Sequence, residues 1–185
     1  MPVRTFIALE LSDAQKDGIL GLIERLRSEG LRASWSRRAT IHLTLKFLGD
    51  VEEESLQDVV EATGRAASRV GPFGVSLGGA GAFPSARRPR VLWLGVEADR
   101  ALFDLQGALE EELSELGFER ERRRFKPHVT LGRIREQPSG SIEALLDSLE
   151  IPEGRTVVDS VRVMRSKLSP GGAVHDVVQE IPLGS

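Results

Sequence analysis

The strongest constraint on how this chain can fold is a short pattern that occurs twice. One copy runs from Ile41 to Gly49 and the other from Pro127 to Ile134. Each contains a His-apolar-Thr-Leu motif, the first motif at 42–45 and the second motif at 128–131. Apolar and polar residues alternate through both copies, which is typical of a half-buried strand. Because successive strand side chains point to opposite faces, the sequence predicts two strands that each present a histidine and a threonine on one face.

The duplication separates these motifs from ordinary strand sequence. A single His-x-Thr on a strand usually has no chemical role, but this chain has only three histidines and two of them lie in the motifs. An imidazole can transfer a proton near neutral pH, and a hydroxyl can hydrogen-bond an oxygen. We therefore expect the two motifs to face each other and to act on one substrate.

Composition excludes several other kinds of site. The chain has no cysteine, which removes disulfides, thiolate nucleophiles and cysteine-ligated metals. Its three histidines lack zinc-binding spacing, so we expect no metal site and no cofactor. No apolar run approaches the roughly 18 residues of a membrane span, and the N-terminus does not resemble a signal peptide. We expect a monomer in the cytoplasm with no membrane contact.

Basic residues are concentrated close to the motifs although the net charge is −3. This net charge argues against a general nucleic-acid coat protein. Any one basic run is most often a solvated surface, but two of three clusters adjoin the histidine motifs, which favours an anionic ligand such as a phosphate. The clusters are Arg37 and Arg38; Arg87, Arg88 and Arg90; and Arg120, Arg122, Arg123, Arg124 and Lys126.

The remaining pattern predicts an α+β fold in a single domain, residues 1–185. We expect two pseudo-symmetric β/α lobes with antiparallel sheets and a central cleft, each half of the chain forming strand, helix, strand and helix around its own motif. The glycine-rich segment 78–84 is interpreted as a turn-rich connection. Predicted strands, besides the motifs, cover 3–9, 73–77, 91–96, 156–164 and 174–181, and predicted helices cover 12–30, 52–67, 99–117 and 142–149.

Two histidines, two threonines and nearby arginines point to acid–base chemistry on a phosphoester. Displacement at phosphorus places the entering and leaving oxygens on opposite sides, so one imidazole can accept a proton while the other donates one. Hydroxyl donors can stabilise the charge that builds on the non-bridging oxygens.

The paired motifs resemble the 2H phosphoesterase superfamily, and more closely its RNA 2′,3′-cyclic phosphodiesterase branch, which is similar to 2′-5′ RNA ligases. The resemblance covers nearly the whole chain. It rests on 4–8 (RTFIA), 42–49, 83–84, 89–93 (PRVLW), 125–133 (FKPHVTLGR) and 166–172.

The resemblance implies metal-independent hydrolysis of RNA or nucleoside 2′,3′-cyclic phosphates to 2′-phosphomonoesters. It implies that His42 is the proton donor and His128 the proton acceptor. Thr44 and Thr130 would bind the non-bridging oxygens. Arg133 stands where the family often has an arginine near the phosphate, but strict alternation places it on the face opposite His128 unless a bulge redirects it.

Two further positions carry aromatic rings, and four alternative functions stay open. Alternation assigns Phe47 to the core, whereas His175, where similar proteins usually have tyrosine, is interpreted as an exposed strand residue. The same site could act on 2′,5′-linked oligonucleotides or ADP-ribose cyclic phosphate, or catalyse the reverse ligation. A protein of another class would bind RNA ends without turnover.

Overall fold

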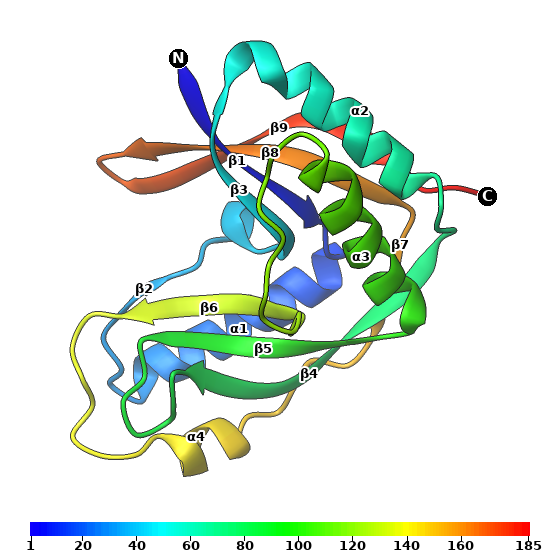
Figure 1. Cartoon of the computed structure of the whole chain (residues 1–185). Coiled ribbons are helices and arrows are strands. Elements are labelled where there is room, and N and C mark those ends of the chain that lie inside the picture. The colour runs from blue at the N-terminus through cyan, green and yellow to red at the C-terminus, as the bar shows by residue number, and fades with distance from the viewer.

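The computed structural model describes residues 1–185 and shows an α+β protein (Figure 1). Its helices are α1 (Asp13–Ser28), α2 (Leu56–Ala67), α3 (Arg100–Ser114), α4 (Glu143–Asp147) and the short 3-10 helices η1 (Arg38–Thr40) and η2 (Glu53–Ser55). Its strands are β1 (Pro2–Leu9), β2 (Ala33–Trp35), β3 (Leu43–Glu52), β4 (Phe73–Phe83), β5 (Val91–Ala98), β6 (His128–Ile134), β7 (Arg155–Val158), β8 (Ser160–Ser169) and β9 (Gly172–Pro182).

The strands form two antiparallel sheets, and each sheet carries one motif. The first sheet has the order β3-β1-β8-β9, and the second has the order β2-β6-β5-β4-β7. The second motif begins β6 at His128, and the first motif leads into β3, with His42 directly before the first strand residue, Leu43. The predicted fold class, with two antiparallel sheets in an α+β protein, is therefore confirmed.

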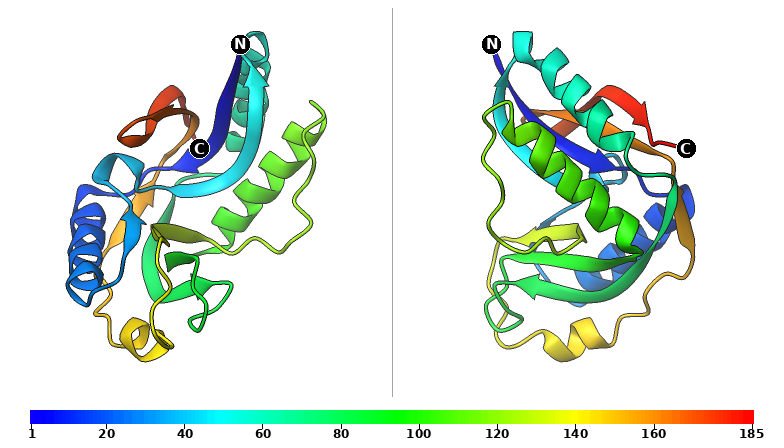
Figure 2. Two further views of the ribbon diagram at one scale, coloured as in Figure 1. Left: turned by 90° about the vertical axis from the view of Figure 1, so that its left-hand side faces the viewer. Right: turned by 45° about the vertical axis from the view of Figure 1, so that its right-hand side comes forward.

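Helices pack against both sheets. Helix α2 contacts β8 and β9 of the first sheet and packs along α3, while α1 contacts β6 of the second sheet. The views in Figure 2 show α2 and α3 side by side and α1 separated from them. None of the helices is long and apolar enough to cross a membrane.

One continuous apolar core joins the helices to one face of each sheet. Ile7 and Leu43 enter it from the first sheet, and Leu94 and Val129 enter it from the second, all fully buried. Phe6, Ala8 and Met164 form a small separate cluster on the other face of the first sheet. Each sheet therefore has a face turned away from the main core, here called its cleft face, which is available for a site.

Each sheet carries one motif, but the strands of a sheet do not all come from one half of the chain, as the repeated strand–helix pattern predicted. Strands β8 and β9, near the C-terminus, join β1 in the first sheet, and β2, near the N-terminus, joins β6 in the second. The predicted strand 156–164 is interrupted, because β7 pairs with β4 in the second sheet whereas β8 pairs with β1 in the first. The chain crosses between the sheets at this point, which sequence alternation alone does not reveal.

The glycine-rich segment was also misassigned. Residues 78–83 continue β4 and do not form a turn-rich connection. Gly81 lies opposite Trp93, and a Cβ at position 81 would collide with the indole ring. Glycine thus makes room for a large neighbour within a strand, as it does where another group approaches closely. The helix predicted at 142–149 is shorter and spans Glu143–Asp147.

Candidate active site

A β-bulge in β3 determines which side chains accompany the first motif. Ala8 of β1 pairs with Thr44 and Phe6 pairs with Phe47, so the register shifts by one residue at Leu45. Ala8 and Phe6 share one face of β1, and directly opposed side chains of neighbouring strands lie on the same face. Phe47 therefore joins Thr44 on the cleft face and is 59% exposed. The prediction that Phe47 belongs to the core is wrong.

The same bulge turns Lys46 toward the protein interior. Its side chain is only 4% exposed, and its Nζ lies 2.7 Å from Glu110 Oε2. Nζ also donates to the backbone oxygen of Glu119 at 2.8 Å. Regular alternation would have placed Lys46 beside Thr44, so the bulge exchanges a lysine for a phenylalanine on the cleft face.

A second bulge has the same effect in β6. Trp93 of β5 pairs with Thr130 and Val91 pairs with Arg133, with a register shift at Leu131. Since Trp93 and Val91 share one face of β5, Arg133 lies on the same face as Thr130. The bulge therefore overturns the strict alternation that assigned Arg133 to the opposite face, and it brings this exposed guanidinium to the cleft face.

The two motifs are local structural repeats of each other. In each, the threonine is followed by a bulged leucine, and the residue two positions beyond that leucine returns to the cleft face. That position holds Phe47 in the first sheet and Arg133 in the second. One side of the site thus offers an aromatic ring and the other a cation.

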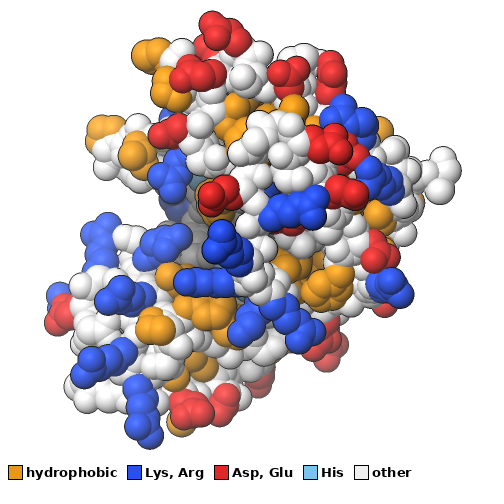
Figure 3. All heavy atoms as spheres, viewed as in Figure 1, with side chains coloured by type: hydrophobic (Ala, Val, Ile, Leu, Met, Phe, Trp, Pro, Cys, Tyr) orange, Lys and Arg blue, Asp and Glu red, His pale blue; other side chains and the backbone are white.

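A short connection holds the two motifs together. Ser36 donates from Oγ to the Thr130 backbone oxygen at 2.7 Å and from its amide to the Leu131 oxygen at 2.8 Å. The chain then passes through η1 directly to His42. Residues of β3 and β6 approach within 8 Å of each other between Cα atoms. Figure 3 shows a hollow between the upper and lower parts of the molecule, bordered by Lys and Arg side chains.

Aromatic contacts fix the His42 ring. Its centroid lies 4.9 Å from that of Phe6 in a stacked arrangement, and 5.2 Å from that of His175. Burial lowers the pKa of His42 to about 4, with smaller contributions from the charges of His175 and Lys16. His42 is therefore neutral at pH 7 in the ligand-free protein.

His175 belongs to the same cluster. Its ring lies edge-on to Phe6 at 5.0 Å, and its Nδ1 is buried without a hydrogen-bond partner. Burial lowers the pKa of His175, and the nearby charge of Arg37 lowers it further. The interpretation of His175 as an exposed strand residue is wrong, because β9 brings it to the cleft face beside His42.

A hydrogen bond fixes the tautomer of His128. Its Nδ1 lies 2.6 Å from the backbone oxygen of Lys126. A carbonyl can only accept, so Nδ1 carries the proton and the lone pair of the neutral ring is on Nε2. Phe83 lies edge-on to the ring at 5.3 Å, and Trp93 lies 6.3 Å away. The ring is thus oriented with a free proton acceptor.

The remaining side chains of the site are donors. Thr44 and Thr130 are both half-buried on the cleft faces. No group of three or more His, Cys, Asp or Glu side chains in the chain is arranged to hold a metal ion. The site can therefore offer two imidazoles, two hydroxyls and the Arg133 guanidinium to one anionic group.

Comparison with known proteins identifies the family. The model of the 2′-5′ RNA ligase superfamily matches residues 13–169, which include both motifs. The chain belongs to this superfamily. The family resemblance inferred from the two motifs is thereby confirmed.

Individual members of the superfamily match almost end to end. The RNA 2′,3′-cyclic phosphodiesterase of Thermotoga maritima is 35% identical over 96% of this chain and 94% of its own length. The protein of the same name from Methanothermobacter thermautotrophicus is 34% identical over 95% and 96%. Among solved structures, a Thermus thermophilus protein superposes with a TM-score of 0.81 at 27% identity, covering 98% of this chain and 99% of its own. E. coli LigT complexed with 3′-AMP gives 0.78 at 25% identity, covering 100% and 99%.

Sequence reasoning missed the aromatic residues that surround the two histidines. Phe6 and Phe83 each contact one motif histidine, yet both lie in segments that were expected to contribute only to strands or turns. The glycine at position 81 opposite Trp93 is the one signal that could have indicated a face kept open for a large ring.

Proposed function

We propose that this member of the superfamily hydrolyses the 2′,3′-cyclic phosphate at the end of an RNA strand and leaves a 2′-phosphomonoester. The observation that carries the proposal is the pair of His/Thr motifs on neighbouring strands of two different sheets, each turned to a cleft face. The names of the Thermotoga and Methanothermobacter relatives support the same activity.

In the proposed reaction, water attacks phosphorus on the side opposite the 3′ oxygen. His128 accepts a proton from this water, since its Nε2 lone pair is free while Nδ1 is held by Lys126. The bond from phosphorus to the 3′ oxygen breaks, and His42 donates the proton that this oxygen needs. The attacking and leaving oxygens then face different histidines, as in-line displacement requires.

The donor role of His42 sets a condition on substrate binding. With a pKa of about 4, roughly one His42 ring in a thousand is protonated at pH 7 in the ligand-free protein. A bound phosphate anion favours the imidazolium and so raises this pKa. We propose that the substrate itself charges the donor, which couples proton donation to occupancy of the site.

Thr44, Thr130 and Arg133 are assigned to the non-bridging oxygens of the phosphate. The two hydroxyls can donate from opposite strands, and the guanidinium adds a fixed positive charge on the side of His128. These donors would stabilise the charge that builds in the transition state. We also propose that the protein acts as a monomer, since all the assigned groups come from one chain, and that it works in the cytoplasm.

The test is hydrolysis of an RNA oligonucleotide ending in a 2′,3′-cyclic phosphate, in the presence of EDTA, with the product identified by phosphorus NMR. We expect a 2′-phosphate from the wild type and none from His42→Ala or His128→Ala. A parallel panel contains a 2′,5′-linked oligonucleotide and ADP-ribose cyclic phosphate.

The outcomes separate the alternatives. If the wild type hydrolyses another compound of the panel faster than the RNA 2′,3′-cyclic phosphate, that compound and not the RNA end is the substrate. RNA binding by the wild type without turnover of any substrate would identify a binding module. Turnover that EDTA abolishes would contradict the metal-independent reaction.

A further inference from the structure

Arginines make up half of the lining of a pocket outside the motifs. It has a volume of about 630 Å³, and its lining residues are Pro84, Arg87, Arg88, Arg90, Gln137 and Pro138. The first four belong to the connection between β4 and β5, and the last two follow β6. The proposed reaction at the cyclic phosphate uses none of these residues.

The charge of this pocket is not neutralised within the protein. Arg87, Arg88 and Arg90 are exposed, and none of them forms an ion pair. Most of the ion pairs in the chain do involve an arginine. No carboxylate and no apolar side chain apart from the two prolines lines the pocket. Three unpaired guanidiniums around one hollow fit a ligand with more than one negative charge, because each guanidinium can bind a phosphate through two N–H groups.

Hydrogen bonds hold the wall of the pocket in place. Gln137 Nε2 donates to the backbone oxygen of Pro89 at 2.8 Å, which joins the two lining segments. The Arg90 amide donates to the Phe83 oxygen at 2.8 Å, and the Ile134 amide donates to the Arg90 oxygen at 2.9 Å. The arginines are therefore presented from a fixed backbone, which reduces the entropy lost on binding.

The pocket adjoins the cleft face of the second sheet. Phe83, which contacts His128 at 5.3 Å between ring centroids, directly precedes the lining residue Pro84. At the same end of the sheet, Val91 pairs with Arg133 and directly follows Arg90. In Figure 3, blue side chains continue from the hollow between the two parts over the region of the β4–β5 connection. A chain that enters the site can continue along this face to the arginines.

We propose that the arginine pocket binds the phosphodiester backbone of the RNA upstream of its cyclic phosphate end. The inference rests on the proposed function for the nature of the strand that enters the site. The pocket makes the enzyme prefer an oligonucleotide to a mononucleotide, because only an oligonucleotide reaches both places. Binding to phosphates without base contacts also makes this preference independent of sequence and sensitive to salt.

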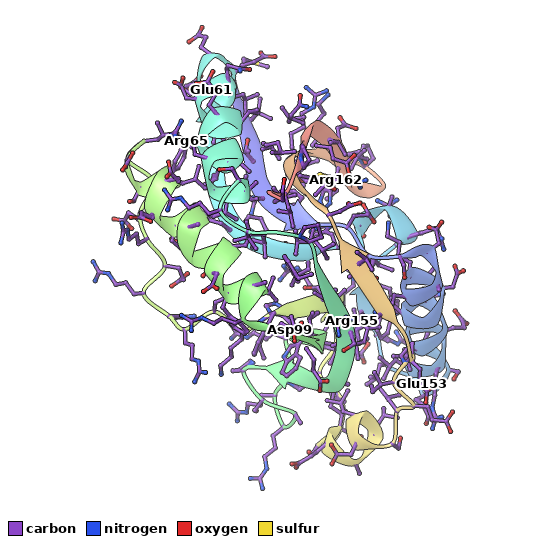
Figure 4. The ribbon with its side chains drawn as sticks, turned by 90° about the vertical axis from the view of Figure 1, so that its right-hand side faces the viewer. Glu61, Arg65, Asp99, Glu153, Arg155 and Arg162 are labelled. Atoms are coloured by element: carbon purple, nitrogen blue, oxygen red, sulfur yellow. The ribbon has the colours of Figure 1, made fainter.

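The experiment compares two substrates and two double variants. The substrates are a nucleoside 2′,3′-cyclic phosphate and an RNA oligonucleotide that ends in the same cyclic nucleotide. The pocket variant is Arg87→Gln/Arg88→Gln. The control, Arg100→Gln/Arg155→Gln, removes two exposed arginines that pair with Asp104 and Asp99 at the opposite end of β5 (Figure 4 labels Asp99 and Arg155).

We expect the pocket variant to lower kcat/KM for the oligonucleotide about tenfold, mainly through KM, and to leave the mononucleotide unchanged. For the oligonucleotide, the slope of log kcat/KM against log salt concentration should be less negative by about 1 in the pocket variant than in the wild type. The control should follow the wild type on both substrates. An equal change on both substrates, or no change on either, overturns the proposal.

A binding measurement separates this inference from the proposed function. Fluorescence anisotropy of a labelled oligonucleotide with a 3′-phosphate end gives the Kd without any turnover. If the wild type hydrolyses neither substrate, the proposed function fails, but the pocket variant should still bind this oligonucleotide about tenfold more weakly than the control. Equal Kd values for the pocket variant and the control would refute binding of RNA by the pocket. If polyglutamate of the same charge competes with the labelled oligonucleotide as well as unlabelled RNA does, the pocket binds polyanions in general and not RNA.

Discussion

The pKa of His42 predicts a specific dependence of stability on pH. The ring lies stacked on Phe6 and beside His175, and its pKa falls from the ordinary 6.5 to about 4. A shift of this size corresponds to about 3 kcal/mol that opposes protonation in the folded state. The unfolded chain binds this proton more readily than the folded protein does. The contribution of His42 to the free energy of unfolding is therefore fully present above pH 6.5 and is lost as the pH falls toward 4.

The perturbation is the substitution His42→Asn, which removes the titrating group while keeping a polar side chain of similar size. Between pH 7 and pH 5, we expect the free energy of unfolding of the wild type to fall by about 2 kcal/mol more than that of the variant. Other titrating groups contribute almost equally to both proteins, so the difference isolates His42. Urea-induced unfolding followed by circular dichroism at the two pH values measures it.

Identical pH dependence of the two proteins would refute this reasoning, because it would mean that His42 titrates alike in the folded and unfolded states. Histidine NMR provides the direct check. The His42 resonances should move with a midpoint near pH 4 in the ligand-free protein, and inorganic phosphate should raise that midpoint. The second effect tests whether an anion charges the proposed donor.

Three substitutions test other parts of the account. Gly81→Ala should lower the free energy of unfolding by about 1–3 kcal/mol, measured in urea, since the new methyl group collides with Trp93; an unchanged stability would mean that the ring moves freely. Lys46→Ala should cost about 3–5 kcal/mol because it leaves the largely buried carboxylate of Glu110 without its cationic partner, and a loss below 1 kcal/mol would contradict the buried ion pair. Phe47→Ala should change stability by less than about 1 kcal/mol but raise KM for RNA about tenfold if the exposed ring stacks on a base; an unchanged KM would remove that role.

The sequence predicted the parts of the site that depend on local pattern. Alternation and the scarcity of histidine correctly identified the two strands, the shared face of each His/Thr pair and the α+β class. These features follow from the preference of a single strand for one buried face.

The sequence could not predict features that depend on pairing between distant strands. The bulges at Leu45 and Leu131 arise from the registers of β3 with β1 and of β6 with β5, and they reversed the faces of Phe47 and Arg133. His175 reaches His42 only because β9 pairs with β8 in the first sheet. A prediction of side-chain faces from strict alternation assumes regular strand pairing, so it fails where a bulge adds one residue.

In the proposed reaction, His42 and His128 act together on one phosphate. The most direct test is the kcat/KM of the wild type, His42→Ala, His128→Ala and the double variant on one RNA 2′,3′-cyclic phosphate. If the two imidazoles serve one transition state, each single substitution should cost about 10²–10⁴-fold and the double should be hardly worse than the more damaged single variant. Losses that multiply in the double variant would show that the two histidines act independently, which contradicts the account.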